Sequence, residues 1–522
     1  MNRKILFPVI IFFTNLIVYG FFNYGGIRSP DSEIVFRTTE SLLHQHEFAV
    51  QEPISWDYFG LGPGKDNKRY SIFGPAESIL AVPFLYVADY LKNNNIFLVD
   101  NDIIPLSFHV NNSGELAGVY YLNNEKPPTF NGHYERFIVS FFNVFVGALS
   151  GVLFFYLILN LTKSTWISFY TTFIYSFGSL IFSYTGSFLS EPLCTLLIII
   201  SFLFIINNET EGKSKNEKFR NYFYSGLFLG LAITAHISAV LSIPFYYMFL
   251  LGQESKVKIK TKHFVGALLH FTTGLVIFCS LLLYYNYARF GNIFETGRSA
   301  DPLAHYAIYT NPLPGIFGLL FSAGKGVFIY SPIVFLSIYF WKPFHKRYPH
   351  LSTAIIGMIL VRIFFLASRS DWHAGFALGP RYLLIIIPFL FIPIAIGIKE
   401  VVERQKLKQF ILISIFSLTC IIQQLFFSIG EIFSYLHTIY INQEKLGNYV
   451  LLNNSLYLSW KYSPALYLLN YKTGPFLLGL ITNNNYQLWL FVSVIFSLIF
   501  ITVCFFSYKI KITQIHQNKA NH

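Results

Sequence analysis

Hydrophobic runs of about 17 to 25 residues recur along this chain, and each is long enough to cross the hydrocarbon core of a bilayer as an α-helix. Polar segments separate them. The pattern predicts an all-α polytopic membrane protein with about twelve transmembrane helices, whose ends are placed to within a few residues. The predicted spans are residues 5–22, 137–160, 166–186, 191–207, 221–235, 237–251, 264–287, 326–341, 351–367, 382–398, 409–429 and 488–507.

The lysine and arginine residues between these runs set the orientation. With the N-terminus in the cytoplasm, every dense basic cluster falls on the inside, as the positive-inside rule requires. These clusters are Lys213/Lys215/Lys218/Arg220, Lys256/Lys258/Lys260/Lys262, Lys342/Lys346/Arg347 and Lys399/Arg404/Lys406/Lys408. Both termini are therefore predicted in the cytoplasm, with polar segments 23–136, 288–325, 368–381 and 430–487 outside.

One apolar stretch, residues 79–91, is not counted as a span. It is short, and it contains Pro83 and Asp89. Making it a span would invert the rest of the chain and expose the later basic clusters, so we expect a helix that lies along the outer surface. The first outer segment is rich in aromatic and apolar residues, and we expect it to fold as a cap on the membrane region.

The chain is accordingly divided into three regions. Residues 1–429 are predicted to form the transmembrane region that carries the candidate functional residues, and residues 23–136 within it are the first extracytoplasmic loop. Residues 430–487 are a second large extracytoplasmic loop, and residues 488–522 are the last span with a cytoplasmic tail. The N-terminal run carries no cleavage site of the A-x-A type, so we expect it to remain as the first span.

Composition supports a membrane protein and removes several other classes. Hydrophobic residues make up 54% of the 522 residues and charged residues only 12%, against about 25% charged in soluble domains. The net charge of +12 comes from clusters between spans, so no nucleic-acid partner is expected. No Walker, Rossmann, serine-hydrolase or zinc-protease motif is found in a supporting context, and we expect no required metal or cofactor.

Two acids at the start of the first outer segment are candidates for a functional carboxylate. Ser29 followed by Pro30 predicts the start of a helix above the end of the first span. Glu33 can pair with Arg37 four residues later. Asp31 has no cation at helical spacing, which makes it the better candidate for an unpaired functional carboxylate; its alternative role is to complement the helix dipole.

Further candidates lie at the outer ends of later spans. Glu191 is either a first-turn acid of its span or a substrate contact, and His236 either faces the wet interface or lines a cavity. Arg362 lies within a span and needs a partner, for which an acid of the cap is a candidate. Arg381 suits bidentate contact with a phosphate, although an arginine can also lie in the aromatic belt of the interface. Trp372 and His373 complete the substrate-binding candidates.

Several stretches of the chain, taken together and in their order along it, resemble the GT-C fold glycosyltransferases that use lipid-linked sugars. This group includes protein mannosyltransferases and aminoarabinose transferases. The stretches run from about residue 29 to 393: SPDSEIVFRTTESLL, RYSIFGPAESILAVPF, SEPLCTLLIIISF, GLFLGLAITAHISAVLSIP, NYARFGNIFETG, GLLFSAGKGVFIYSPI and WHAGFALGPRYLLIIIPFL. The resemblance places the catalytic base at Asp31, with Glu33 as the close alternative. It departs from the family at His236, where relatives often have lysine or arginine.

The resemblance implies an inverting transfer of sugar from a polyprenyl-phosphate donor to an acceptor hydroxyl of unknown identity, outside a plasma membrane that is expected to be a bacterial inner membrane. Arg381, with His236 or Arg362, would hold the phosphate. Two alternatives stay open: a polytopic transporter, and a polysaccharide polymerase or ligase. A transporter of this size usually has related halves and charged or broken helices at the midplane, whereas this chain has a long outer loop.

The predicted orientation can be tested by cysteine labelling. A cysteine introduced between Lys256 and Lys262 should be protected from an impermeant thiol reagent, because that loop is cytoplasmic, whereas a cysteine near Gly114 should react. Labelling of intact cells measures both. The opposite pattern would overturn the orientation, and the outward-facing site with it.

Overall fold

The computed structural model describes residues 3–27, 29–51, 59–96, 133–209, 213–256, 261–300, 309–375, 377–430, 432 and 457–467. The predicted all-α membrane fold is confirmed, and the number of spans stays a prediction. Five described helical stretches are long and apolar enough to cross a membrane, and four shorter apolar helices accompany them. The predicted last span, residues 488–507, lies outside the described residues.

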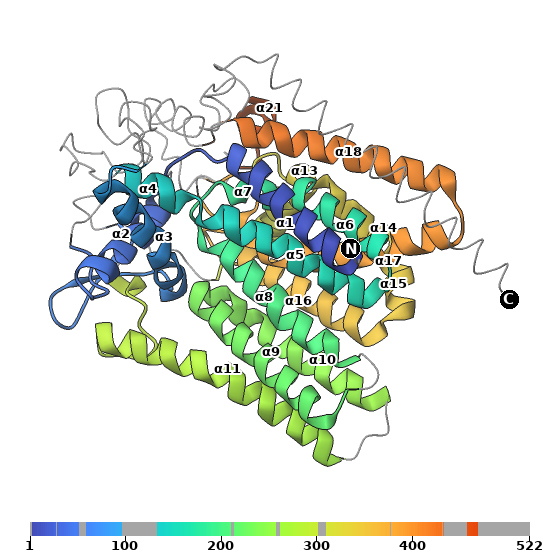
Figure 1. Cartoon of the computed structure of the whole chain (residues 1–522), viewed down its shortest axis with the longest axis horizontal. Helices are drawn as coiled ribbons and strands as arrows, with labels where there is room; N and C mark the ends of the chain where they lie inside the picture. Colours follow the sequence, from blue (N-terminus) through green and yellow to red (C-terminus); the bar gives the residue numbers. More distant parts are fainter. Residues whose placement is uncertain are drawn as a thin grey trace.

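The first outer segment contributes a helix, a short hairpin and a second helix. Helix α2 (Pro30–His44) and helix α3 (Pro75–Asn93) pack together, and α4 (His133–Ser140) packs on α3. Figure 1 shows these three helices gathered at one end of the molecule. The described part of this segment is therefore folded, as predicted. The hairpin of β1 (Leu61–Pro63) and β2 (Arg69–Ser71) was not predicted.

The long helices form the membrane region. The helices and 3₁₀ turns are α1 (Arg3–Phe21), α5 (Phe142–Thr162), α6 (Thr165–Phe177), α7 (Ile181–Thr185), α8 (Ser190–Ile206), η1 (Asn207–Glu209), α9 (Lys215–Ala235), η2 (Ile237–Ser242), α10 (Ile243–Lys256), α11 (Thr261–Phe290), η3 (Arg298–Ala300), α12 (Pro312–Phe321), α13 (Val327–Tyr330), η4 (Pro332–Val334), α14 (Phe335–Tyr339), α15 (Trp341–Arg347), α16 (Pro349–Ala367), η5 (Arg381–Ile386), α17 (Ile387–Glu403), α18 (Leu407–Ile429), η6 (Trp460–Tyr462) and α21 (Pro464–Tyr467).

Several predicted spans are broken in the structure. Residues 326–341 form the separate helices α13 and α14 with the turn η4 between them, because Pro332 cannot donate a backbone hydrogen bond. Residues 166–186 divide into α6 and α7 at Gly178. Helix α12 falls in a segment predicted to be polar, and its ten residues are too few for a span. The expectation of one continuous helix over residues 326–341, and of another over residues 166–186, was wrong.

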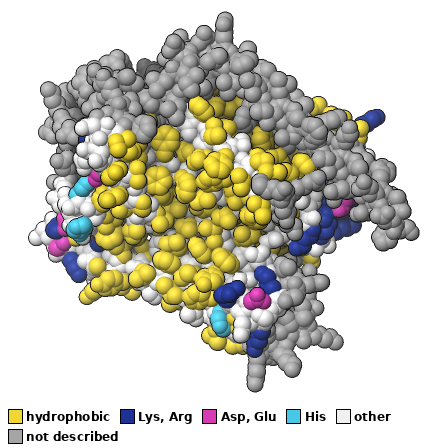
Figure 2. Space-filling model, in the orientation of Figure 1, with side chains coloured by type: hydrophobic (Ala, Val, Ile, Leu, Met, Phe, Trp, Pro, Cys, Tyr) yellow, Lys and Arg dark blue, Asp and Glu magenta, His cyan; other side chains and the backbone are white. Residues whose placement is uncertain are grey.

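The surface of the membrane region is apolar. Figure 2 shows hydrophobic side chains covering the middle of the visible face, with charged side chains toward its margins. Helix α11 alone exposes Val265, Leu269, Val276, Leu281 and Tyr284. The basic helix α15 lies at the end away from the cap helices (Figure 1), as the predicted orientation requires. A lipid environment accounts for exposed side chains of this kind.

Helices α9 and α11 pack closely through glycine. A Cβ on Gly226 would lie 1.9 Å from the carbonyl oxygen of Phe271, and one on Gly274 would lie 2.1 Å from that of Phe223. Gly230 has a similar contact, at 2.7 Å from the Leu275 oxygen. Small residues spaced four apart let two helix backbones approach in a membrane. This contact positions the outer end of α9, where His236 lies.

We expect Gly226→Ala to destabilise the protein, because the added methyl group collides with backbone that cannot rotate away. Overpacking of this kind costs about 1–3 kcal/mol. The matched control is Gly20→Ala in α1, where the nearest atom to the added Cβ is 3.8 Å away. Thermal unfolding in detergent compares the two variants. Equal melting temperatures would show that the close contact between α9 and α11 is not needed for stability.

Candidate functional site

The start of α2 carries Asp31 and Glu33, as the sequence predicts. Ser29 is the N-cap, its hydroxyl accepts a hydrogen bond from the Ser32 amide (3.2 Å), and Pro30 occupies the first turn. The two acids are two residues apart, so they point in directions about 200° apart around the helix. They consequently have different partners.

Glu33 lies in a buried ion-pair cluster. Its side chain is 0% exposed, and its carboxylate accepts hydrogen bonds from Nε of Arg37 (2.9 Å) and from Nε and Nη2 of Arg136 (3.0 and 2.6 Å). The predicted pair with Arg37 is confirmed, whereas Arg136, about a hundred positions away in the chain, was not predicted. Burial would raise the pKa of Glu33, but the two guanidinium groups hold it below its ordinary value. A carboxylate held this firmly is poorly placed to accept a proton.

Asp31 is paired with Arg381. The Nη2 atom of Arg381 donates to Oδ2 of Asp31 at 2.9 Å. The expectation that Asp31 is unpaired was therefore wrong. Its cation is Arg381, which is distant in the sequence and does not belong to α2. The Asp31 side chain keeps 24% of its surface exposed, against 11% for Arg381. Asp31 is thus the accessible acid of the two.

Arg381 is also paired with Glu191. Nε of Arg381 lies 3.1 Å from Oε1 of Glu191, close enough for an ion pair although the N–H is not aligned for a hydrogen bond. Glu191 is in the first turn of α8 and Arg381 begins η5. Gly379, in the left-handed region at φ 61°, directs the chain toward this site, and a Cβ there would lie 2.8 Å from the Tyr330 ring. Arg381 thus joins α2, α8 and η5.

His236 extends this network. It caps η2, and its Nδ1 accepts from the amide of Ser238 (3.4 Å) and lies 2.7 Å from the Ser238 hydroxyl. Since Nδ1 accepts, the neutral ring carries its proton on Nε2, which lies 3.9 Å from Glu191. Burial, together with the charge of Arg362 and Arg381, lowers the pKa of His236 to about 3. The ring is therefore neutral and lines the site.

Arg362 supports His236 and does not face the cap. It is 1% exposed, and its Nη2 donates to the Ser238 hydroxyl (2.6 Å), its Nη1 to the Ser238 carbonyl (3.2 Å) and its Nε to the Tyr382 carbonyl (3.3 Å). The expectation that Arg362 pairs with an acid of the cap was wrong. Backbone and hydroxyl oxygens accept these three hydrogen bonds. They fix Arg362, and Arg362 in turn fixes Ser238 and His236.

Trp372 and His373 lie in the loop before Arg381. The Trp372 ring is 2% exposed and packs so closely on α12 that a Cβ on Gly318 would lie 2.2 Å from it. His373 stacks on Tyr457 at 4.1 Å between ring centroids, and its Nδ1 accepts from the Gly375 amide (3.0 Å). Burial lowers the pKa of His373 to about 3. Trp372 thus shapes the loop from inside the protein, and its assignment to substrate contact remains a prediction.

Lys325 is a positioning residue that the sequence analysis did not select. It is 1% exposed, and its Nζ donates to the carbonyls of Gly375 (2.7 Å) and Ala377 (2.6 Å). The segment of Tyr457 is tied to the same place, since the Gly324 amide donates to the Tyr457 carbonyl (3.0 Å). A lysine between two glycines, directly before an apolar run, was a usable sequence signal. Its carbonyl partners were not visible there.

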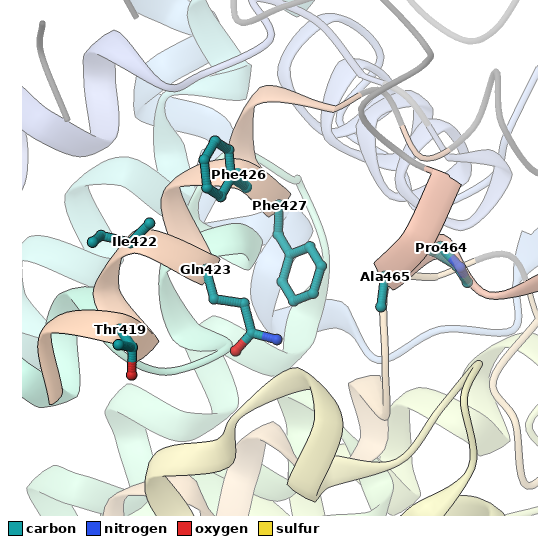
Figure 3. Close-up of a pocket in the computed structure, with 7 residues that line it drawn as sticks. All are labelled: Thr419, Ile422, Gln423, Phe426, Phe427, Pro464 and Ala465. Carbon is teal, nitrogen blue, oxygen red and sulfur yellow. The ribbon is translucent and has the colours of Figure 1, made fainter. Parts of the chain in front are cut away.

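A cavity of about 300 Å³ lies on another side of this region, between α18 and α21. Figure 3 shows its lining residues: Thr419, Ile422, Gln423, Phe426, Phe427, Pro464 and Ala465. Phe427 stacks on Tyr330, the residue beneath Gly379. Among the described residues, no charged side chain lines this cavity. In the described part of the chain, no group of three histidine, cysteine, aspartate or glutamate residues is arranged to hold a metal.

Comparison with known proteins agrees with this architecture. The sequence matches the family described as dolichyl-phosphate-mannose-protein mannosyltransferase over residues 80–290, less than half of the chain. That stretch includes Glu191 and His236 but neither Asp31 nor Arg381. Comparison with curated proteins gives no significant match.

Among solved structures, the chain is similar to the oligosaccharyltransferase of Archaeoglobus fulgidus. The apo form and the complex with an inhibitory peptide and a dolichol-phosphate each give a TM-score of 0.50 at 10% identity, over 90% and 91% of this chain. The chain spans 56% and 57% of those chains, little more than half of their length. ArnT from Cupriavidus metallidurans bound to undecaprenyl phosphate gives 0.49 at 11% identity, over 96% of this chain and 76% of ArnT. The predicted GT-C fold is confirmed.

We expect Glu33→Gln to destabilise the protein strongly, because it leaves two buried guanidinium groups without their shared carboxylate. Removing one partner of a buried pair costs about 3–5 kcal/mol. Since the folded-state pKa of Glu33 is below its ordinary value of 4.5, its stabilising effect is present at neutral pH and is lost as the pH falls below that value. Thermal unfolding measured from pH 7 down to about pH 2 tests both statements.

The control for this prediction is Glu47→Gln. Glu47 pairs with Lys68 at the surface, where an ion pair contributes about 0–1 kcal/mol. Similar melting temperatures for Glu33→Gln and Glu47→Gln would contradict a structural role for Glu33 and return it to the candidates for the catalytic base.

Proposed function

We propose that this chain, a membrane protein of the GT-C fold, is an inverting glycosyltransferase that moves a sugar from a polyprenyl phosphate to an acceptor hydroxyl at the extracytoplasmic face. The observation that carries the proposal is the Arg381 site, in which one guanidinium bridges the acids Asp31 and Glu191 beside the folded cap. The family match over residues 80–290 supports the same class of donor, since that family uses a lipid-linked mannose.

Arg381 is suited to hold the leaving group. Its planar guanidinium presents parallel N–H groups that fit the oxygens of a phosphate. Without a donor these groups bind Asp31 and Glu191. A phosphate that takes over the Nη2 hydrogen bond would release the Asp31 carboxylate, so donor binding and the freeing of the base are coupled through one side chain.

The reaction follows from these two residues. The acceptor oxygen attacks the anomeric carbon on the face opposite the phosphate, and the bond from that carbon to the phosphate oxygen breaks. The proton of the acceptor hydroxyl moves to the Asp31 carboxylate, and the polyprenyl phosphate leaves with the bonding electrons. Arg381 stabilises the negative charge that develops on the leaving phosphate. The configuration at the anomeric carbon is inverted.

The alternatives have less support. A transporter would place its charged site at the bilayer midplane between related halves, whereas Arg381 and Asp31 lie where the cap meets the membrane helices. A polysaccharide polymerase or ligase would use the same outer site with a larger donor.

Purified protein in nanodiscs should transfer sugar from a short-chain polyprenyl-phosphate sugar and should continue to do so with a chelator present. Asp31→Asn should lower the rate by about 10²-fold or more, because the general base is lost, while the melting temperature and donor binding are retained. Radiolabelled sugar in the acceptor fraction measures transfer. Anomeric NMR of the product measures inversion.

Two further variants test donor binding: Arg381→Ala removes the proposed phosphate ligand, and Glu47→Gln is the surface control. The first should weaken binding of polyprenyl phosphate, and lysine at this position should restore it only in part, because a lysine lacks the planar fork; the second should leave transfer unchanged. Transfer from a nucleotide sugar alone would contradict the donor class. Near-normal transfer by Asp31→Asn would move the base to Glu191 or Glu33, and solute accumulation in proteoliposomes without transfer would favour the transporter.

A further inference from the structure

The end of the membrane region that lies away from the cap carries a surface rich in lysine and arginine. Figure 1 places α14, α15 and α17 at this end, and Figure 2 shows Lys and Arg side chains there, where the hydrophobic face stops. We call this region the basic surface. Its members, all exposed, are Lys163 after α5, the three residues Lys342, Lys346 and Arg347 of α15, and Lys406 and Lys408 at the start of α18.

Two contacts bring α15 to the start of α18. The Nε2 atom of Gln409 donates to the hydroxyl of Tyr339 at 2.8 Å, which joins the end of α14 to the first turns of α18. In α17, a Cβ on Gly397 would lie 1.9 Å from the ring of Phe340, the residue directly before α15. The cations of α15 and of α18 therefore belong to one surface.

The end of α5 is held at the same place. The hydroxyl of Tyr348 donates to the carbonyl of Leu161 at 2.7 Å, and Nζ of Lys399 donates to the carbonyl of Thr162 at 2.6 Å. These are terminal carbonyls of α5, which no amide of the helix itself can reach. Lys163 follows them in the left-handed conformation that ends the helix. It thus joins α15 and α17 at the basic surface.

The positive charge of the basic surface is not compensated within the described part of the chain. The two acids of the neighbouring segment are already paired, Glu400 with Arg404 at 2.7 Å and Glu403 with Lys399 at 3.7 Å. Among the described residues, no acid forms an ion pair with any member of the basic surface. The two lysines of α18 also lie at the start of their helix, where the helix dipole disfavours a cation. The stability of α18 does not account for them.

Apolar side chains adjoin the basic surface. Helices α14 and α18, which the Tyr339–Gln409 hydrogen bond joins, each expose a row of large hydrophobic residues. These residues are Phe335, Ile338 and Tyr339 on α14, and Leu407, Ile411, Leu412 and Ile415 on α18. A ligand that matches both surfaces has an anionic group at one end and hydrocarbon at the other.

We propose that the basic surface binds the head group of an anionic phospholipid in the leaflet opposite the cap, with the acyl chains against the exposed side chains of α14 and α18. Phosphate oxygens accept charge-assisted hydrogen bonds from lysine and arginine. The positive-inside rule accounts for an excess of cations on one side of a membrane protein. It does not require residues from separate segments to meet on one surface beside an apolar face.

The inference does not rest on the proposed function, because the basic surface lies at the opposite end of the membrane region from Asp31 and the cap. Each lysine or arginine near an anionic membrane surface strengthens binding about fivefold. Several cations on one surface therefore distinguish an anionic lipid from a zwitterionic lipid with the same acyl chains.

The experiment compares two lipids on the full-length protein in a neutral detergent: dioleoyl phosphatidylglycerol and dioleoyl phosphatidylcholine. Native mass spectrometry measures the lipid that is retained, and thermal unfolding measures the stabilisation that binding confers. The natural protein should bind phosphatidylglycerol at least about tenfold more tightly than phosphatidylcholine. The stabilisation by phosphatidylglycerol should decrease as the salt concentration rises.

The variant that tests the surface combines Lys342→Gln, Lys346→Gln and Arg347→Gln. It should bind phosphatidylglycerol on the order of tenfold more weakly or worse, because three cations are removed, while its binding of phosphatidylcholine is unchanged. If this variant does not fold, the comparison of the two lipids on the natural protein at low and high salt still decides the proposal.

The matched control combines Lys215→Gln, Lys218→Gln and Arg220→Gln. It removes the same charge from α9, where the cations lie on one helix with Glu217 among them, and it should bind phosphatidylglycerol as the natural protein does. Equal binding of the two lipids by the natural protein would overturn the proposal, and so would equal losses in the two combined variants. Equal stabilisation by glycerol 3-phosphate would assign the surface to a soluble anion instead of a lipid.

Discussion

The guanidinium of Arg381 is the contact on which the outer half of the structure depends. It binds Asp31 of the cap and Glu191 of α8, and thereby fixes three segments that are separated by 160 or more positions in the chain. Each pair is only partly exposed, so water screens the interaction weakly and its geometry is retained. Without Arg381, two carboxylates would face each other at the membrane surface.

The supporting residues around Arg381 donate mainly to uncharged oxygens. Arg362 donates to Ser238 and to the Tyr382 carbonyl, and Lys325 donates to the carbonyls of the loop before Arg381. These buried cations use backbone oxygens and leave the acids to Arg381. In the proposed mechanism this leaves Arg381 able to exchange the Asp31 carboxylate for a phosphate oxygen.

The sequence predicted correctly those features that depend on residues close together in the chain. The start of α2 follows from Ser29 and Pro30, and the pair of Glu33 with Arg37 follows from helical spacing. It failed where the partner is distant in sequence. Arg136 completes the Glu33 cluster and Arg381 pairs with Asp31, and no periodicity in one segment indicates which other segment will pack against it.

The breaks within the predicted spans were also missed because they depend on contacts with distant segments. Hydropathy over residues 326–341 predicts a span, because the average over a window ignores the missing donor of Pro332. The structure satisfies the freed backbone groups by packing α13 and α14 against α17 and α18, where Gln423 and Gln424 donate to the carbonyls of Ile329 and Tyr330. Broken helices at membrane depth are tolerated where protein covers them.

Asp31 and Glu33 show why residue type and position along the chain do not assign the base. Both are acids in the first turn of one helix, and both complement its dipole. Their separation of two residues turns Glu33 toward the helices of the cap, where Arg37 and Arg136 hold it, and Asp31 toward the membrane helices, where it pairs with Arg381, the arginine proposed to hold the phosphate. A base has to exchange its partner during the reaction. In the proposed mechanism the acid that does so is Asp31, because a phosphate would take its place on Arg381 and no buried charge would be left unpaired.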